Sequence, residues 1–186
     1  MSSPAEVVAC GPPRIRDAVP ADAGPCAAIY APFVAGSVVS LEESPPDSSE
    51  MARRIESVQR THAWLVREVD GRVVGYAYGA PFRSRYAFRW TAEVSVYLAP
   101  QARGNGSGRA LYEALFDVLA ARGYRRVVAC VVEPNPASTA LHRVLGFGLV
   151  GTFRDVGYKG GAWQDLTFIE RAIGPDDDPP PQHLGP

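Results

Sequence analysis

The chain of 186 residues is poor in cysteine and has no long apolar segment. Its three cysteines, Cys10, Cys26 and Cys130, form an odd number without the spacing of a metal site, so we expect neither a disulfide framework nor a bound metal. Cys130 lies inside an apolar run, where we expect a buried thiol. No apolar run approaches the ~18 residues of a membrane helix, and the first residues do not resemble a secretory signal. These features predict a cytoplasmic protein without a membrane partner.

The chain also lacks an excess of charge of either sign. The formal net charge is −1, from 19 Lys and Arg against 20 Asp and Glu. Proteins that bind nucleic acid or an anionic membrane surface carry a basic excess, so neither partner is expected. Hydrophobic residues make up 46% of the chain and charged residues 21%, which is the balance of a globular domain with one core.

The two ends of the chain have little hydrophobic pattern. Residues 1–13 contain three prolines and are expected to be flexible. Residues 174–186 are rich in proline and aspartate and cannot contribute to a core, so we expect a disordered tail. The remaining residues, 14–173, are predicted to form one domain without internal repeats.

Strand patterns alternate with helix patterns along this domain. The first helix is expected to be interrupted near Pro32, and Asp70-Gly71 predicts a hairpin turn. The alternation indicates an α/β fold in which helices lie on the faces of a mixed sheet. The expected strands are 14–18, 63–69, 73–80, 91–99, 127–132, 147–154 and 163–171, and the expected helices are 21–34, 48–59, 108–122 and 136–145.

A glycine-rich segment, Arg103-Gly104-Asn105-Gly106-Ser107-Gly108, joins a predicted strand to a predicted helix. Without a Cβ, glycine allows backbone N–H groups to approach phosphate oxygens, and the helix N-terminus adds partial positive charge. The segment is not a P-loop, because Gly108-Arg109-Ala110 lacks the Lys-Ser/Thr pair. It also comes too late in the fold for a dinucleotide-binding fingerprint. The glycines alone fit a plain strand-to-helix turn equally well.

Side chains alternate in direction along the predicted strand 91–99. One face is aliphatic and should lie in the core, whereas the other carries a carboxylate one strand upstream of the glycine-rich segment. The aliphatic positions are Ala92, Val94, Val96 and Leu98, and the opposite positions are Glu93, Ser95 and Tyr97.

Three groups of segments resemble the GCN5-related N-acetyltransferases. Residues 96–108 resemble the acetyl-CoA motif of that superfamily, and residues 134–138, 141–142 and 145–147 resemble its second cofactor segment. Residues 82–93 together with 157–165 look like those of the phosphinothricin and methionine sulfoximine acetyltransferases within it. The resemblance extends from about Ile15 to Arg171. It implies the GNAT fold, an α/β fold with a mixed, twisted sheet of about six to seven strands flanked by helices on both faces.

The resemblance implies acetyl-CoA as co-substrate and no metal. It also implies that the strand 91–99 splays from its neighbour and leaves backbone groups free for the pantetheine arm, and that residues 104–109 hold the pyrophosphate. A backbone N–H near the end of that strand is expected to donate a hydrogen bond to the oxyanion of the tetrahedral intermediate. The cofactor-binding residues on this basis are Val96, Tyr97, Leu98, Arg103, Gly104, Asn105, Gly106, Ser107, Gly108, Arg109, Asn135 and Ser138.

Two residues are catalytic candidates. Free α-amino groups have a pKa of about 8, so a base near the amine is needed at neutral pH. Glu93 falls on the catalytic glutamate of the family and would act directly or through a water; the alternative is an exposed strand glutamate. His142, which aligns with a histidine of the phosphinothricin group, could protonate the CoA thiolate or assist Glu93 as a second base. A helix histidine bonded to the backbone is its alternative.

The substrate side depends on two arginines in a loop. Arg83 and Arg85 can grip a carboxylate, which would suit an α-amino acid; a solvated basic loop is the alternative. The predicted substrate-binding residues are Arg83, Ser84, Arg85, Glu93, Val94 and Ser95. Tyr158, Trp163 and Asp165 could form a pocket wall or a dimer contact, or the aromatic rings could pack on a strand.

The sequence therefore predicts an acyltransferase that moves the acetyl group of acetyl-CoA to a small amino acid or analogue of the phosphinothricin or methionine sulfoximine type. A protein or peptide N-acetyltransferase and a non-catalytic acetyl-CoA-binding regulatory module remain as alternatives. We also expect a homodimer, because members of the family commonly pair through the sheet and the C-terminal region.

Overall fold

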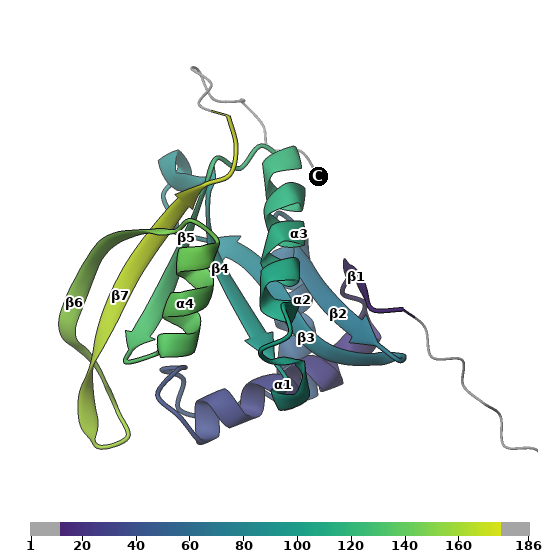
Figure 1. Ribbon diagram of the computed structural model, residues 1–186, viewed down its shortest axis with the longest axis horizontal. Helices are drawn as coiled ribbons and strands as arrows, with labels where there is room; N and C mark the ends of the chain where they lie inside the picture. The colour runs from purple at the N-terminus through teal and green to yellow at the C-terminus, as the bar shows by residue number, and fades with distance from the viewer. Residues whose placement is uncertain (1–11, 176–186) are drawn as a thin grey trace, which may run out of the picture.

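A computed structural model describes residues 12–175, so the predicted flexible segments at the two ends lie almost entirely outside the described residues. Seven strands form one sheet in the order β1-β2-β3-β4-β5-β7-β6 (Figure 1). All neighbours are antiparallel except β4 and β5, which confirms the predicted mixed sheet. The strands are β1 Arg14–Asp17, β2 Trp64–Val69, β3 Arg72–Pro81, β4 Thr91–Leu98, β5 Arg126–Glu133, β6 Gly148–Lys159 and β7 Ala162–Ala172.

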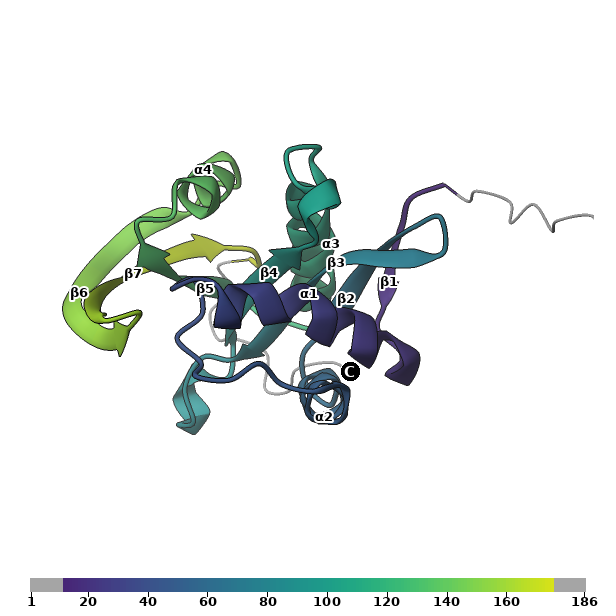
Figure 2. The same ribbon diagram turned by 90° about the horizontal axis from the view of Figure 1, so that it is seen from below.

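Four α-helices cover the two faces of the sheet, as predicted. Figure 2 shows α1 and α2 on one face and α3 and α4 on the other. α2 begins after Asp47, whose side chain accepts a hydrogen bond from the backbone N–H of Glu50 at 2.8 Å and so caps the helix. The helices are α1 Ala23–Ala35, α2 Ser48–Gln59, α3 Ser107–Ala121 and α4 Pro136–Val144.

Two local expectations have opposite outcomes. The hairpin between β2 and β3 is confirmed, and Asp70 and Gly71 adopt the positive φ values of 51° and 72° that a two-residue turn requires. The expected interruption near Pro32 is wrong, because α1 continues through it. Pro32 stands in the last turn, and the N–H of Gly36 still bonds its carbonyl at 3.0 Å. Val34 is 1% exposed, so burial on the sheet holds this turn in place.

Each face of the sheet has its own apolar cluster. Leu111 and Leu115 of α3 are completely buried in the same cluster as Ala92 of β4, which confirms the predicted aliphatic face of that strand. The cluster on the other face joins α1 and α2 to the sheet through Tyr30, Val34, Met51, Trp64, Val66 and Tyr76.

β4 and β5 separate after three paired positions, and the last of these pairs joins Glu93 to Val128. Within residues 12–175, the rest of β4 pairs only with β3. Figure 1 shows β4 and β5 diverging. The predicted splay is therefore confirmed, and one edge of residues 94–98 has no strand beside it.

Candidate active site

Glu93 stands at the point where the two parallel strands separate. Its side chain is on the α1 and α2 face of the sheet and is half-buried. Burial raises the pKa of Glu93 above its ordinary value, and the positive charge of Arg83 and the neighbouring Cys130 thiol oppose this rise. A carboxylate with a raised pKa, held at the mouth of an open strand edge, has the properties of a general base.

Cys130 of β5 lies beside Glu93. The expectation of a buried thiol is wrong, since Cys130 is only partly buried. Burial and the charge of Glu93 raise the pKa of Cys130 to about 12, so the thiol stays protonated. The parallel register places it there, because Val128 is opposite Glu93 and Cys130 follows two residues later on the same face.

Tyr78 of β3 is a site residue that the sequence did not reveal. It stands opposite Ser95 of β4 in the antiparallel register. Burial raises the pKa of Tyr78, and the charge of Glu93 adds to this rise. Tyr78 therefore lies near Glu93 and Ser95, two of the three predicted substrate-side residues of β4, whereas the third, Val94, is buried in the cluster on the α3 face. The position of Tyr78 depends on the β3–β4 register, which no pattern in the sequence predicts.

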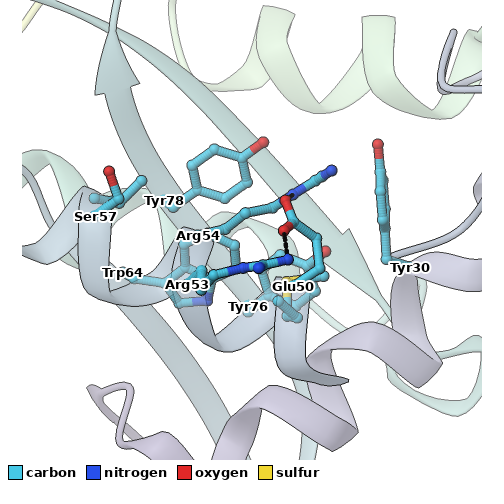
Figure 3. A pocket seen from close by; sticks show the side chains of 10 residues that line it. Tyr30, Glu50, Arg53, Arg54, Ser57, Trp64, Tyr76 and Tyr78 are labelled. Carbon is cyan, nitrogen blue, oxygen red and sulfur yellow. Dashed lines mark hydrogen bonds and ion pairs between the residues drawn. The ribbon is translucent and has the colours of Figure 1, made fainter. Parts of the chain in front are cut away.

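A cavity of about 490 Å³ lies between α1, α2, β2 and β3, and Tyr78 forms part of its wall. Figure 3 shows Tyr30 and Tyr78 on either side of the charged side chains that α2 contributes. Trp64 and Tyr78 are stacked with ring centroids 4.4 Å apart. The lining residues are Tyr30, Glu50, Met51, Arg53, Arg54, Ser57, Val58, Trp64, Tyr76 and Tyr78.

One carboxylate organises the charged side of this cavity. Glu42 accepts hydrogen bonds from Arg54 at 2.8 and 3.0 Å and from the hydroxyl of Tyr30 at 2.8 Å. The Arg54 guanidinium holds the pKa of Glu42 below its ordinary value. Arg54 also pairs with Glu50 at 3.0 Å, so its charge is neutralised and its orientation is fixed.

The two arginines predicted to bind a carboxylate are both exposed in the loop before β4. The charge of Arg83 acts on Glu93, while one of its N–H groups bonds the carbonyl of Phe82 at 3.0 Å. Arg85 precedes the short turn Tyr86–Phe88 and has no recorded contact with Glu93 among the described residues. The structure thus places the charge of Arg83 near enough to act on Glu93 and leaves Ser84 and Arg85 exposed in the loop.

The glycine-rich loop has the geometry of an anion site. Gly104 and Gly106 have φ values of 73° and 83°, and no atom lies within 4 Å of the position that a Cβ would occupy on either residue. The side chain of Asn105 accepts bonds from the Ser107 N–H at 3.2 Å and from its hydroxyl at 2.7 Å, which shapes the turn into α3. Open glycines before the N-terminus of a 15-residue helix fit the phosphates of a nucleotide-bearing ligand.

Two arginines flank this loop. The Nε of Arg103 donates to the carbonyl of Leu98 at 3.2 Å, and its guanidinium lies 5.0 Å from the centre of the Phe33 ring. Arg109 pairs with Glu113 at 2.7 Å on the exposed side of α3. Both side chains are exposed, so each can turn toward a bound phosphate.

α4 lies beside the split, which is the gap between β4 and β5 after their last paired position. Asn135 caps it by accepting a bond from the Ser138 N–H at 3.1 Å. The Nδ1 of His142 donates to the carbonyl of Ser138 at 2.8 Å, which leaves Nε2 as an acceptor 3.3 Å from the hydroxyl of Tyr112. His142 is 5% exposed, and burial lowers its pKa, so the ring is neutral at physiological pH.

Tyr112 connects His142 to β4. Its hydroxyl is 3.5 Å from the carbonyl of Val94, the first residue past the split. Within residues 12–175, the His142 ring contacts Ser138, Tyr112 and Phe147, so the two catalytic candidates, Glu93 and His142, do not touch. The predicted cofactor residues surround the split and the loop, whereas Glu93 faces the cavity side.

Two further observations concern the described residues alone. Between residues 12 and 175, no three His, Cys, Asp or Glu side chains are grouped so as to hold a metal ion. No helix in that range combines the length and the apolar character needed to cross a membrane.

Comparison with known proteins agrees with this geometry. The model of the acetyltransferase (GNAT) domain matches residues 15–168. The chain is 37% identical over 160 residues to phosphinothricin N-acetyltransferase of Streptomyces viridochromogenes, which covers 86% of this chain and 87% of that protein. It is 36% identical over 168 residues to L-methionine sulfoximine/L-methionine sulfone acetyltransferase of Pseudomonas paraeruginosa, with 89% and 98% covered.

A solved structure extends the likeness to three dimensions. The crystal structure of a GNAT superfamily phosphinothricin acetyltransferase from Sinorhizobium meliloti in complex with AcCoA aligns with a TM-score of 0.88 and 38% sequence identity. The alignment covers 94% of this chain and 96% of that chain.

Proposed function

This chain belongs to the GNAT acetyltransferase family, and we propose that it moves the acetyl group of acetyl-CoA to the amine of a small amino acid or amino-acid analogue, with Glu93 as general base. The acceptors named for its relatives, phosphinothricin and methionine sulfoximine or sulfone, define the class of substrate. The observation that carries the role of Glu93 is its place at the last β4–β5 pair, with acetyl-CoA residues on one side and a cavity on the other.

Acetyl-CoA supplies the acetyl group as a thioester. We assign its pyrophosphate to residues 104–109, where positive-φ glycines open the loop before α3. The pantetheine arm fits the unpaired edge of β4, with Asn135 and Ser138 of α4 on its other side. A backbone N–H of residues 96–98 would donate to the carbonyl oxygen as negative charge develops there.

The acceptor amine must lose a proton before its lone pair can attack the thioester carbonyl. Glu93 accepts that proton, a C–N bond forms, the C–S bond breaks, and the CoA sulfur leaves with the electron pair. Arg83, close enough to act on Glu93, would bind the acceptor carboxylate together with Arg85 from the open loop. The cavity between α2 and β3 would receive the acceptor side chain.

His142 is suited to a supporting role. Its ring is neutral and its Nε2 accepts from the Tyr112 hydroxyl, whose oxygen lies 3.5 Å from the carbonyl of Val94. His142 would therefore hold Tyr112 against β4 beside the split.

The same protein would act as a dimer in the cytoplasm. The two described cysteines, Cys26 and Cys130, are free thiols, as expected in a reducing compartment. The β6–β7 hairpin carries an exposed apolar surface that a second copy would cover. Its residues, each more than half exposed, are Leu149, Val150, Phe153, Val156, Tyr158 and Trp163.

Release of CoA with a panel of acceptors tests this proposal. The panel contains phosphinothricin, methionine sulfoximine, methionine sulfone, the common amino acids and a short peptide with a free N-terminus. We expect turnover with small amino-acid analogues and an N-acetylated product by mass spectrometry. Turnover with the peptide alone would favour the protein acetyltransferase alternative. Tight acetyl-CoA binding without turnover of any amine would favour the regulatory module.

A further inference from the structure

Lys159 is the single lysine of this chain, which has 18 arginines at its other basic positions. It is the last residue of β6, in the hairpin that follows the site elements. Its Nζ donates hydrogen bonds to the backbone carbonyls of Val34 at 2.6 Å, Ser40 at 2.7 Å and Glu42 at 2.8 Å. All three donors of the ammonium are therefore used.

The chemistry of this contact explains the residue type. An ammonium is a compact charge with three donors that diverge from one nitrogen, whereas a guanidinium is a planar fork suited to carboxylates and phosphates. Three carbonyls that converge on one point fit the ammonium alone. One of them, that of Val34, belongs to the last turn of α1, where helix carbonyls lack intrahelical donors and a cation is favoured.

The other two carbonyls, those of Ser40 and Glu42, belong to the segment that links α1 to α2, residues 36–47. The hairpin tip also lies directly against this segment. A Cβ on Gly157 would come within 2.9 Å of Leu41, and one on Gly160, whose φ is +64°, would lie 3.4 Å from Val38. The α1–α2 segment is thus fastened to the β6–β7 hairpin, more than 110 residues away in the sequence, by an ammonium and by close packing.

The α1–α2 segment also contacts two residues of the cavity wall. Glu42, whose carbonyl Lys159 holds, uses its carboxylate to hold Arg54 and Tyr30. Both of these side chains line the cavity beside Tyr78 (Figure 3). A chain of hydrogen bonds therefore runs from the hairpin through Lys159 and Glu42 to the cavity wall.

We propose that Lys159 is a positioning residue for acceptor binding, because it fixes the α1–α2 segment so that Glu42 can hold Arg54 and Tyr30 in the cavity wall. The assignment of this cavity to the acceptor rests on the function proposed above. Lys159 does not touch the acetyl-CoA residues, so its effect should fall on the acceptor.

Kinetics of three variants test the coupling. Lys159→Met removes the donors and Lys159→Arg keeps the charge in the wrong shape. Arg154→Met is the matched control, because Arg154 is a cation of the same hairpin whose one ion pair within residues 12–175 is with Asp165. We expect both Lys159 variants to raise KM for the acceptor about tenfold or more, as misplaced binding groups do, while KM for acetyl-CoA and the control variant stay within twofold of wild type. Equal changes in both KM values, or wild-type kinetics in Lys159→Arg, would overturn the proposal.

A measurement on the wild-type protein tests the contact between Lys159 and the α1–α2 segment independently of the proposed function. Protein labelled with 15N-lysine gives one ammonium signal, because the chain has one lysine. We expect slow exchange of the Nζ protons with water and protection of the amides of residues 36–47, both lost in Lys159→Met. If the Nζ protons exchange with water as fast as those of free lysine, Lys159 does not hold the α1–α2 segment, even if the enzyme is active, and the proposal is overturned. Failure of all acceptors to react would leave this signal unchanged and would count against the proposed function alone.

Discussion

Glu93 of β4 stands opposite Val128 of β5 in the last pair that joins these two parallel strands. Past this pair the strands diverge, and the backbone edge of β4 is free of a strand neighbour as far as Leu98. In the proposed function, the thioester would lie along this free edge of β4 with its carbonyl near the Glu93 carboxylate. Three of the predictions below concern Glu93 as the proposed base.

The first concerns pH. The base must be ionised, and burial raises the pKa of Glu93, so activity should be present above this raised pKa and should be lost as pH falls through it. The acidic limb of the kcat profile should lie above the ordinary value of 4.5. Arg83→Ala removes a nearby positive charge, which raises the pKa further and moves the limb to higher pH. Measuring kcat at saturating acceptor avoids effects on binding. Arg83→Lys, which keeps the charge, should retain the wild-type limb; equal profiles for Arg83→Ala and wild type would contradict the assignment.

The second concerns Cys130, whose thiol lowers the pKa of the Glu93 carboxylate. Cys130→Ala should move the acidic limb upward by up to about one pH unit, which corresponds to 1.36 kcal/mol. Cys130→Ser keeps a donor and should restore most of the wild-type profile. The affinity for acetyl-CoA, measured by calorimetry, should be the same in all three proteins. A Cys130→Ala limb at the wild-type pH would show that the thiol does not act on the base.

The glycine loop allows a matched pair of substitutions. Gly106 has a φ of +83°, where an alanine is strained, whereas Gly24 of α1 has open space and a helical backbone. Gly106→Ala should raise KM for acetyl-CoA about tenfold or more by distorting the turn before α3, with little change in KM for the acceptor. Gly24→Ala should leave both constants unchanged and raise the melting temperature slightly. Unchanged acetyl-CoA binding in Gly106→Ala would remove the loop from the cofactor site.

The exposed hairpin face predicts an effect on assembly. The rings of Tyr158 and Trp163 meet edge to face at 5.3 Å, and Phe153 is 58% exposed nearby in the same hairpin. Phe153→Asp should convert a dimer into a monomer in sedimentation velocity at micromolar concentration. The control is Arg154→Met, because Arg154 is next to Phe153 and pairs with Asp165. The other neighbour, Thr152, is less suitable because its side chain is hydrogen-bonded to Thr167. A wild-type protein that sediments as a monomer would contradict the dimer.

The fold was largely predictable from the sequence, because hydrophobic periodicity and glycine or proline punctuation mark each element. Pro32 was the exception, since the burial of Val34 outweighs the helix-breaking tendency of a proline placed so near the helix end. The cofactor loop and Glu93 were also predictable, as local motifs and strand parity identify them. Their roles in binding and catalysis stay predictions.

The partners of Glu93 were not predictable for a physical reason. Cys130 and Tyr78 reach it through the registers of β4 with β5 and with β3, which depend on the packing of the whole sheet. Lys159 reaches the α1–α2 segment across more than 110 residues. Such long-range contacts leave no periodic signal in a single sequence.

The most direct test of the account is the rate of CoA release in Glu93→Gln with the best acceptor of the panel. Glutamine keeps the size of the side chain but cannot take a proton. We predict that kcat/KM for the acceptor falls by about 10²–10⁴-fold, that the dissociation constant of acetyl-CoA stays unchanged, and that the loss is partly recovered at high pH, where the free amine is already unprotonated. A Glu93→Gln enzyme with wild-type kcat/KM at neutral pH would contradict the role of Glu93 as the base.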